Sequence, residues 1–254
     1  MMETASLSAA RAKLIRSLDL KKFRDAAGLF VVEGEKMVQE AEASAFRVED
    51  IYRTAQIGEA AMRRISHLST PSPALALVRK PDAVELGGDA LAGALGTAGL
   101  YLALDGIKDP GNLGTMLRIA DWFGLDGVFA SPDSVDFFNP KVVQATMGAI
   151  FRVRFHTCDI PALCRAARRS GGHAYGTFLD GEDLYRQPAL STGGEAPVVL
   201  VVGNESRGIG EAVSAQVDGR LFIPPFPAGR SGSESLNAAV AASLAIAEFR
   251  RRSR

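Results

Sequence analysis

Three glycine-rich segments of the sequence carry the residue types that could do chemistry. They read DGIKDPGNLGT from residue 105, GNESRGIG from residue 203 and IPPFPAGRSGSESLN from residue 223. Glycine permits a close approach of backbone to a ligand, and proline stiffens a loop while leaving its carbonyls free to accept hydrogen bonds. Segments of this composition are therefore candidates for a ligand site.

Apolar runs surround these segments and predict an α/β fold with a parallel sheet. From Leu100 onward, short apolar runs alternate with helical segments, which is typical of parallel strands covered by helices on both faces. The runs read YLALD, GVFA, RVRFH, HAYGTFL, PVVLVVG and RLFIP. Ligands of such sheets bind where the strands end at their carboxyl edge, so we expect the glycine-rich segments to converge there.

Capping signals and periodicity place several helices between and after these strands. The segment LGTMLRIADWFG is expected to end at Gly124 and to pack through Leu113, Leu117 and Ala120. Another helix is expected to begin with Asn139 as its cap and Pro140 in its first turn. The Ala-rich helix near the end of the chain is expected to pack through Leu236, Ala239, Val240, Ser243, Leu244 and Ala247.

Residues 1–95 are expected to form a separate, small α/β sandwich. Its predicted elements are a helix in SLSAARAKLIRSL, a strand in LFVVEG, a helix in KMVQEAEAS, a strand in FRVEDIYRT, a short helix near residues 58–67 and the apolar run ALALV. The stretch 81–99 is rich in Gly and Ala and low in charge. We therefore place the boundary within it and predict two domains, 1–95 and 96–254.

The composition excludes several classes of protein. The chain has 254 residues, of which 47% are hydrophobic and 23% charged, which is ordinary for a globular protein. No apolar run approaches the ~18–20 residues of a membrane helix, and the first residues lack the apolar core of a signal peptide. Cys158 and Cys164 have no matching Cys or His pair nearby. We expect both to be reduced and structural, and the protein to be cytoplasmic.

The motifs of several common enzyme classes are missing from the sequence. No segment matches a phosphate loop or the dinucleotide glycine pattern, and GNESRGIG lacks the serine of a nucleophile elbow. His67, His156 and His173 are scattered, and no His/Cys/Asp cluster has the spacing of metal ligands. We therefore expect neither metal chemistry nor hydrolysis by a catalytic triad.

The charge pattern leaves two interpretations open. The formal net charge is zero, so no global positive field indicates a nucleic-acid partner. Basic residues nevertheless gather at both ends, in residues 1–24 and in the final FRRRSR. These charges are either solvated helix ends or two arms that touch a polyanion.

The three glycine-rich segments together resemble the SpoU (TrmH-type) RNA methyltransferases of the SPOUT superfamily. The matching blocks are DGIKDPGNLGTMLRIA, LVVGNESRGIG and IPPFPAGRSGSESLNA, in this order. They span the chain from about Leu100 to Arg250. The stretch RSLDLKKFRDAAGLFVVEGEKMVQEA more weakly resembles the RNA substrate-binding domain, of the ribosomal-protein L30e type, that often precedes the SpoU domain.

The resemblance implies a fold and an activity. The C-terminal part of the parallel-sheet domain would form a deep trefoil knot, whose loops would bind S-adenosyl-L-methionine (AdoMet). The protein would be a homodimer with its sites near the interface, and it would need no metal. Its expected reaction is methylation of a ribose 2′-hydroxyl in rRNA or tRNA.

The resemblance also assigns roles to residues. Arg118 is the expected catalytic residue, and we assign it the binding of a phosphate and the stabilisation of the developing alkoxide, because a guanidinium is a poor base. Whether the proton of the hydroxyl passes to Arg118 or to water stays open. Asn112 is expected to cap the helix that carries Arg118. Glu205 is expected to orient Arg118 through a charge-assisted pair. Ser235 and Asn237 are expected to cap the last helix and to support the catalytic group.

Other residues are expected to contact the cofactor or the RNA. Gly203, Ile223 and Leu236 are implied cofactor contacts, with Thr177, just after the strand HAYG, expected beside them. An RNA path beside the site is expected to include Lys141, Arg152, Arg154 and Arg230. Two alternatives stay open, namely a SPOUT enzyme that methylates a base nitrogen and a non-catalytic RNA-binding protein of the same fold.

Overall fold

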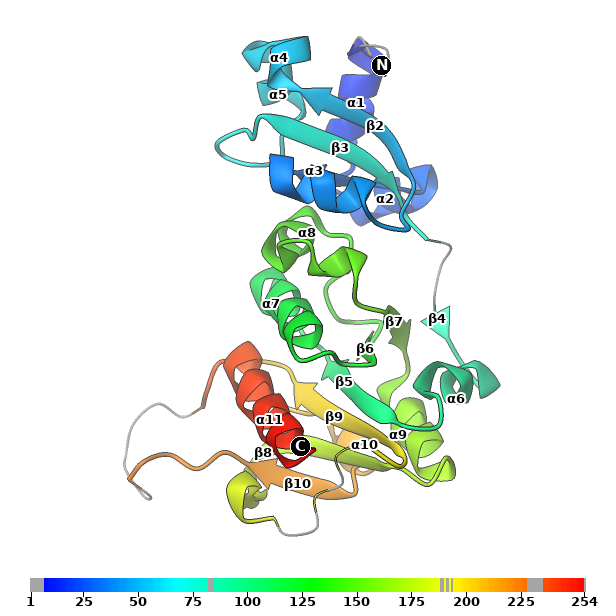
Figure 1. The fold of residues 1–254 in the computed structure, drawn as a ribbon, viewed down its shortest axis with the longest axis vertical. Helices are drawn as coiled ribbons and strands as arrows, with labels where there is room; N and C mark the ends of the chain where they lie inside the picture. The colour runs from blue at the N-terminus through cyan, green and yellow to red at the C-terminus, as the bar shows by residue number, and fades with distance from the viewer. Residues whose placement is uncertain are drawn as a thin grey trace. The chain divides into compact units, whose positions relative to one another are not determined.

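The computed structural model describes residues 7–81, 85–187, 190, 192, 194–227 and 235–253. It divides into two compact units, which are drawn in Figure 1. Unit 1 comprises residues 1–83 and 136–152, and unit 2 comprises residues 84–135 and 153–254. No helix among the described residues is long and apolar enough to cross a membrane.

Unit 2 is built on a seven-stranded sheet in the order β10-β8-β9-β5-β6-β7-β4. Every pair of neighbouring strands runs parallel. The strands are β4 (Glu85–Leu86), β5 (Gly99–Asp105), β6 (Gly127–Ala130), β7 (Phe155–Cys158), β8 (His173–Asp183), β9 (Pro197–Gly203) and β10 (Gly219–Phe222). The predicted α/β fold with a parallel sheet is therefore confirmed. The two-residue strand β4 lies in the Gly/Ala-rich stretch and was not predicted.

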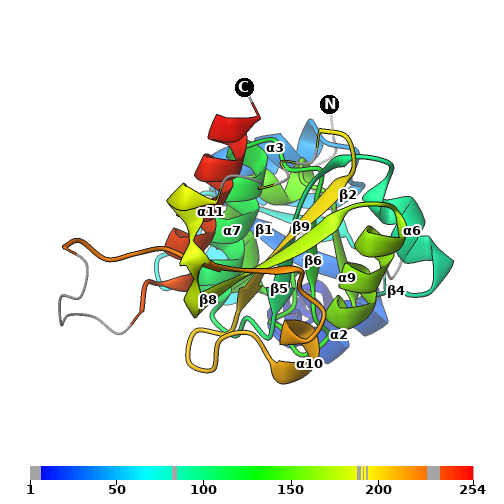
Figure 2. The ribbon, with the colours of Figure 1, turned by 90° about the horizontal axis from the view of Figure 1, so that it is seen from below.

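Helices cover both faces of this sheet, as Figure 2 shows. On one face lie α6 (Asp89–Leu95), α9 (Ile160–Arg169) and α10 (Glu211–Ser214), and their apolar residues share a buried core with alternate residues of the strands. On the other face lie α7 (Pro110–Trp122) and α11 (Ala238–Arg252), which pack against each other and the sheet. Burial on both faces explains why the central strands β5, β6 and β9 read as continuous apolar runs.

Unit 1 contains a three-stranded antiparallel sheet in the order β1-β3-β2. Its strands are β1 (Leu29–Glu33), β2 (Val48–Arg53) and β3 (Ala74–Arg79), and its helices are α1 (Ala9–Ser17), α2 (Lys21–Ala27), α3 (Glu35–Glu42), α4 (Thr54–Ile57) and α5 (Glu59–Ile65). A buried core joins α1 and α5 to the sheet. The predicted small α/β unit is present, with α2 and α4 as additional short helices.

Residues 136–152 also belong to unit 1, although they follow β6 in sequence. They form α8 (Pro140–Thr146), which Asn139 caps as predicted, and the 3₁₀ helix η1 (Ala149–Phe151). Phe138 packs against Phe30 with ring centroids 4.8 Å apart. Arg24, which is 1% exposed, pairs with Asp136 across 2.6 Å. Because of these long-range contacts, the two compact units differ from the predicted domains 1–95 and 96–254, which assumed a single division of the chain.

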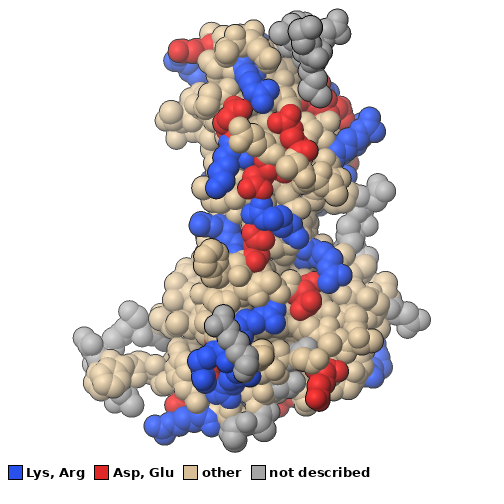
Figure 3. Space-filling view, viewed as in Figure 1, with Lys and Arg blue, Asp and Glu red and all other residues tan. Residues whose placement is uncertain are grey.

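Most basic residues near the two ends of the chain have partners within their own unit. Arg11 donates to Glu49 at 3.0 Å and to Asp50 at 2.9 Å, and Arg24 is buried against Asp136. At the other end, Arg250 donates to the carbonyl of Phe123 at 2.9 Å. These arginines are therefore already bonded within the chain, and the interpretation of the two ends as arms that touch a polyanion stays a prediction. On the face drawn in Figure 3, basic and acidic side chains are interspersed.

The face through which α11 packs differs from the predicted stripe. The buried residues are Ala238, Ala239, Ala242, Ala245, Ile246, Glu248 and Phe249. Val240 and Leu244, by contrast, are 47% and 38% exposed. The larger side chains Ile246 and Phe249 determine which face is buried, because an Ala-rich helix offers little contrast between its faces. The predicted stripe is thus largely the outer, uncovered side of the helix.

The carboxylate of Glu248 anchors the C-terminal end of α11. It is buried and accepts hydrogen bonds from Nε of Arg251 at 2.7 Å and from Nε of Arg252 at 2.6 Å. The hydrogen bond from Arg251 lowers the pKa of Glu248 most. Burial opposes this effect and Arg252 adds to it, so the pKa falls from 4.5 to about 2. Arg252 also donates to the carbonyl of Leu184 at 2.9 Å and so ties the helix to the end of β8.

Glu248→Gln is expected to lower the free energy of unfolding at neutral pH by about 2 kcal/mol. A carboxyl whose pKa is depressed on folding stabilises the folded state above its unfolded pKa, and this contribution disappears as the pH falls from about 4.5 toward about 2. Urea unfolding at pH values above and below this window measures the difference. The exposed Glu195→Gln is the control. A wild-type–variant difference that persists undiminished below this window would contradict the account.

Candidate active site

The glycine-rich segments meet at the carboxyl edge of the parallel sheet, as predicted. β5 and β9 are neighbours, and Asp105 at the end of one is in register with Gly203 at the end of the other. The first segment continues from β5 into α7, and the second forms a tight turn after β9. The third connects β10 to α11, and its residues 228–234, including Arg230, lie outside the described part of the chain. Two long helices therefore begin at this edge.

A chain of hydrogen-bonded side chains joins all three segments. Asn237 Nδ2 donates to Asn112 Oδ1 at 2.8 Å. Asn112 Nδ2 in turn donates to Glu205 Oε1 at 2.9 Å. These residues are separated by 93 and 125 positions in the sequence, so the contacts form only when the fold is complete. The structure thus brings together three of the five predicted catalytic residues.

Helix capping fixes the direction of this chain. Asn237 is the N-cap of α11, as expected, and its Oδ1 accepts from the backbone N–H of Ala239 at 2.9 Å. Its amide Nδ2 must therefore face Asn112, whose own Nδ2 must face Glu205. The expectation that Asn112 caps α7 is wrong. Asp109 is the cap, accepting from the N–H of Asn112 at 2.7 Å, and Asn112 lies inside the helix, 8% exposed.

Glu205 is held as an ionised acceptor. Burial by itself would raise the pKa of this carboxyl. Hydrogen bonds from Asn112 and from the backbone of Glu205, Lys108 and Asp109 outweigh burial and keep the pKa below its usual range. The carboxylate therefore fastens the segment after β9 to the start of α7. It is badly suited to act as a proton donor at neutral pH.

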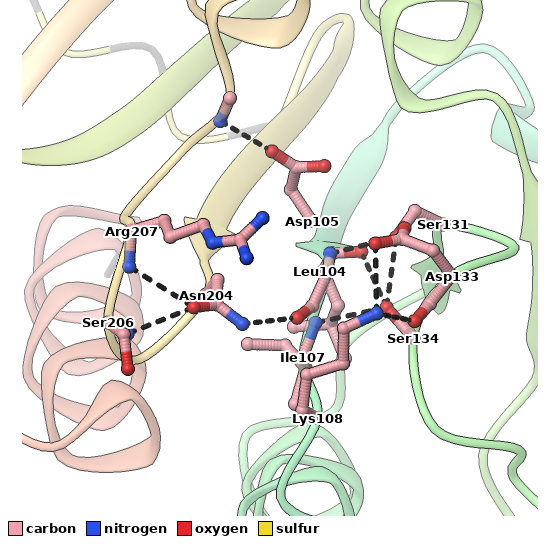
Figure 4. A network of polar contacts seen from close by, with 12 residues as sticks. Leu104, Asp105, Ile107, Lys108, Ser131, Asp133, Ser134, Asn204, Ser206 and Arg207 are labelled. Carbon is pink, nitrogen blue, oxygen red and sulfur yellow. Dashed lines mark hydrogen bonds and ion pairs between the residues drawn. The ribbon is translucent and has the colours of Figure 1, made fainter.

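Asn204 ties the first two segments together at a second point, shown in Figure 4. Its Nδ2 donates to the carbonyl of Gly106 at 2.7 Å, and its Oδ1 accepts from the N–H groups of Ser206 at 2.9 Å and Arg207 at 3.1 Å. Its backbone also pairs with that of Gly208 through two hydrogen bonds of 2.9 Å. The amide oxygen of Asn204 is thus bonded within the turn, and its amide nitrogen is bonded to the loop after β5.

The loop after β5 is further braced by the loop after β6. Ser131 Oγ accepts from the N–H of Gly106 at 2.8 Å and donates to Asp133 at 2.6 Å. Asp133 also pairs with Lys108 across 3.0 Å. Hydrogen bonds from Ser131 and Lys108 hold the pKa of Asp133 below its usual value, despite an opposing effect of burial. Figure 4 shows this network on the opposite side of the loop from Asn204. The start of α7 is therefore held from both sides.

Arg118 and Ser235 stay outside the hydrogen-bonded chain. Arg118 is exposed on α7, and neither its guanidinium nor the Ser235 hydroxyl has a hydrogen-bond or ion-pair partner among the described residues. The expected pair between Glu205 and Arg118 is therefore not present in this chain. Arg118 follows Asn112 by six positions, which places it about 9 Å further along the helix and on a different face. Its guanidinium is free to meet a group that the single chain does not supply.

Gly203 is crowded by the chain itself. A Cβ at this position would lie 2.2 Å from Gly208 C and 2.2 Å from Ile209 N, so the turn after β9 folds directly onto the strand end. The predicted close approach of a backbone is present, but it is the approach of residues 208–209. Gly203 thus shapes the loop that would hold a ligand.

Three other predicted cofactor residues lie at or near this edge. Thr177 lies within β8, not after it, and its hydroxyl donates to the carbonyl of Val201 at 3.4 Å. Ile223 follows the last residue of β10 and is half-buried, and Leu236, just before the α11 cap, is 48% exposed. The exposed side chain of Leu236 and the carbonyls of the Pro224–Pro225 pair fit the adenosine part of AdoMet, which offers a flat ring to cover the one and an amine to donate to the other.

Gly203→Ala is expected to lower the free energy of unfolding by about 1–3 kcal/mol and to weaken AdoMet binding. Backbone atoms, not a flexible side chain, occupy the position of the new Cβ, so the whole turn must shift. Thermal unfolding and calorimetry with AdoMet measure the two effects. Gly194→Ala, where no atom lies within 4 Å of the added Cβ, is the control. A Gly203→Ala variant with wild-type stability and AdoMet affinity would contradict the proposed effect of the crowding at this position.

Comparison with known proteins agrees with this geometry. Residues 99–247 match the SpoU rRNA Methylase family, and residues 10–70 match a domain described as the MRM3-like substrate binding domain. The chain is 29% identical over 265 residues to a 23S rRNA (guanosine-2'-O)-methyltransferase of Bacillus subtilis, covering 98% of this chain and 100% of that protein. Both predicted resemblances are thereby confirmed.

Solved structures share the fold over nearly the whole chain. A Porphyromonas gingivalis protein assigned to the TrmH family of RNA methyltransferases matches with a TM-score of 0.83 and 38% identity, over 98% of this chain and 100% of that one. An AdoMet-bound rRNA methyltransferase of Sinorhizobium meliloti matches with a TM-score of 0.83 and 27% identity, over 98% of this chain and 97% of that one.

Some functional residues were not found from the sequence. Asp109 could have been, because an Asp directly before a Pro is a standard start of a helix. Asn204 was noted only as an unusual neighbour of Glu205, and no local pattern indicates that its amide reaches Gly106. Ser131 and Asp133 carry no motif, and their role appears only where the loops meet.

Proposed function

Because the chain belongs to the SpoU rRNA methylase family, we propose that it transfers the methyl group of AdoMet to a ribose 2′-hydroxyl of RNA. The observation that carries this proposal is the hydrogen-bonded chain Asn237–Asn112–Glu205, which closes all three segments of the family into one site. The names of several relatives specify 23S rRNA and guanosine 2′-O-methylation, so bacterial 23S rRNA is the substrate that we would test first.

The residues of the site divide into supporting and reacting groups. AdoMet, when bound, supplies a methyl group that is already activated, so the protein contributes positioning and electrostatics. We assign its binding to Gly203, Ile223, Leu236 and Thr177. Arg118 would bind the RNA phosphate beside the target and stabilise the developing alkoxide. Asn112, Glu205 and Asn237 would hold the start of α7 in place, with Ser235 nearby.

The N-terminal part of the chain would supply RNA recognition. Its match to a substrate-binding domain supports this role, and we propose that residues 1–95 select the RNA while residues 96–254 carry out methyl transfer in the cytoplasm. Lys141, Arg152 and Arg154 are exposed, although Arg152 pairs with Glu40. Resemblance to the family also supports a trefoil knot in the C-terminal part.

We further propose a homodimer that forms through α7 and α11. Val240 and Leu244 lie one turn apart on the outer face of α11, and Trp122 at the end of α7 is 82% exposed. Because α7 and α11 pack against each other, these apolar side chains lie on one pair of helices, which an interface would cover. Arg118 lies one turn before Trp122, so this interface would bring its free guanidinium close to the partner.

Val240→Asp combined with Leu244→Asp is expected to convert the protein from a dimer to a monomer. Two buried charges at an apolar interface cost far more than they do on a solvated surface. Light scattering at micromolar concentration measures the mass. Leu20→Asp, at a 51% exposed position in unit 1, is the control. A wild-type protein that is monomeric under these conditions would contradict the proposed dimer.

The function is tested by methyl incorporation. The purified protein is incubated with methyl-labelled AdoMet and unmodified bacterial 23S rRNA, with a chelator present throughout, and AdoMet binding is measured by calorimetry. We expect binding and RNA labelling without added metal. Binding that requires zinc or magnesium would contradict the predicted metal independence. Tight AdoMet binding without labelling of any rRNA or tRNA would favour a non-catalytic RNA-binding protein.

A further inference from the structure

The turn after β9 presents a free arginine at the edge of the site. In unit 2, most described arginines are paired or bonded to backbone carbonyls, namely Arg165, Arg168, Arg186, Arg220, Arg250, Arg251 and Arg252. The side chains of Arg118, Arg154, Arg169 and Arg207 have no such partner among the residues described. Arg207 is therefore one of few cations in this unit whose charge is not already used within the chain.

These free arginines lie at different edges of the sheet. Arg154 lies just before β7, and Arg169 ends the helix that precedes β8, so both approach the sheet from the amino ends of the strands. Arg207 follows β9 at the carboxyl edge, where the candidate active site lies. It is two residues from Glu205, which is bonded to Asn112 on the Arg118 helix.

The backbone that carries Arg207 is fixed from several directions. Its N–H donates to Asn204 Oδ1 at 3.1 Å, and the Asn204–Gly208 pair closes the turn around it. The turn rests directly on Gly203, with no room for a Cβ between them. A guanidinium on such a support loses less conformational freedom on binding than one on a flexible loop.

Nearby carboxylates are already engaged elsewhere. Figure 4 shows the Arg207 side chain extending from the turn toward the end of β5, with no interaction drawn from its guanidinium. Asp105, at that strand end, accepts from the N–H of Gly210 at 2.7 Å, and Glu205 accepts from Asn112. Ser206, adjacent in the turn, is exposed, and its hydroxyl has no partner among the described residues.

We propose that Ser206 and Arg207 bind a phosphodiester group of the RNA close to the nucleotide that is methylated. A guanidinium matches the two free oxygens of a phosphate, and a neighbouring hydroxyl adds a donor to the same group. The proposal rests on the proposed function, in that RNA is the substrate. It adds a second contact with the RNA backbone, made by the segment after β9, to the one assigned to Arg118 on α7. The two arginines would together set the path of the RNA strand across the site.

Salt dependence of RNA binding tests this contact directly. Each phosphate contact adds about 0.7–0.9 to the slope of log affinity against log salt. We therefore measure binding of a 23S rRNA transcript from low to physiological salt for the wild type, Arg207→Ala, Arg207→Lys and the control Arg169→Ala. Thermal unfolding and AdoMet calorimetry of each variant show whether the fold and the cofactor site are intact.

Arg207→Ala is expected to weaken RNA binding about 10-fold at physiological salt and to reduce the slope by about one contact. Arg207→Lys should keep most of the slope, and Arg169→Ala should match the wild type. An Arg207→Ala slope equal to that of the control would overturn the proposal, as would a loss of AdoMet affinity, which would place Arg207 in the cofactor site. Absence of RNA methylation by the wild type would instead count against the proposed function.

Discussion

Replacing Arg118 with alanine is expected to lower the rate of methyl transfer by about 10²–10³-fold while leaving AdoMet binding nearly unchanged. Its guanidinium is exposed on α7 and carries no internal role, so the fold does not depend on it. The residues assigned to the cofactor lie on other segments: Thr177 within β8, Gly203 at the end of β9, and Ile223 and Leu236 between β10 and α11. An interaction used mainly in the transition state lowers turnover and leaves ground-state binding alone.

The conservative variant sharpens this prediction. Arg118→Lys keeps the charge but not the planar fork that can hold a phosphate and an alkoxide together, so it should recover little activity. Single-turnover rates and AdoMet calorimetry, with light scattering as a check on assembly, separate the possible effects. Near-normal turnover of Arg118→Ala on RNA that the wild type methylates would show that the assigned mechanism is wrong, even though the fold is right.

Asn112→Asp is expected to lower activity at neutral pH by about 10²-fold and to destabilise the protein by about 1–3 kcal/mol. The substitution keeps the shape of the side chain but replaces the amide donor with a carboxylate, 2.9 Å from Glu205. Two carboxylates that share a site raise the pKa of one of them. The chain Asn237–Asn112–Glu205 would be broken at its centre, and the start of α7 would move.

The pH dependence identifies this cause. When one of the two carboxyls is protonated at lower pH, it can donate to the other and restore the hydrogen bond between positions 112 and 205. The activity of the variant, relative to that of the wild type, should therefore rise as the pH is lowered from about 8 to about 5. Asn139→Asp is the matched control, because Oδ1 of Asn139 only accepts, from the N–H of Lys141 at 2.9 Å, and Asp is an equally good cap. A variant whose deficit is independent of pH would point to a different defect.

The parallel sheet and its edge were predictable because they follow from local patterns. Apolar runs of β5, β6 and β9 are buried on both faces, and the glycine-rich segments directly follow the strands. Asn139 and Asn237 cap helices as their residue types indicate. These features depend on neighbours within a few positions, which a sequence shows plainly.

Features that depend on distant neighbours could not be predicted in the same way. Asn112 satisfies its amide with residues from two other segments, so its role as a link was not visible and a local capping role was predicted instead. The buried face of α11 depends on the sheet and α7, which the near-uniform Ala pattern of the helix does not encode. Residues 136–152 join unit 1 through Phe138 and Asp136, whose partners Phe30 and Arg24 lie more than a hundred positions away.

The most direct test of the proposed reaction is a nucleoside digest of RNA methylated by the purified protein. Unmodified 23S rRNA is treated with protein and isotopically labelled AdoMet, digested to nucleosides and separated by mass spectrometry. The account predicts that the label appears in a 2′-O-methylated nucleoside, with the methyl group on the ribose fragment, and that Arg118→Ala abolishes it. Label on a base fragment would instead identify a base-methylating enzyme and contradict the assignment of the ribose hydroxyl as the acceptor.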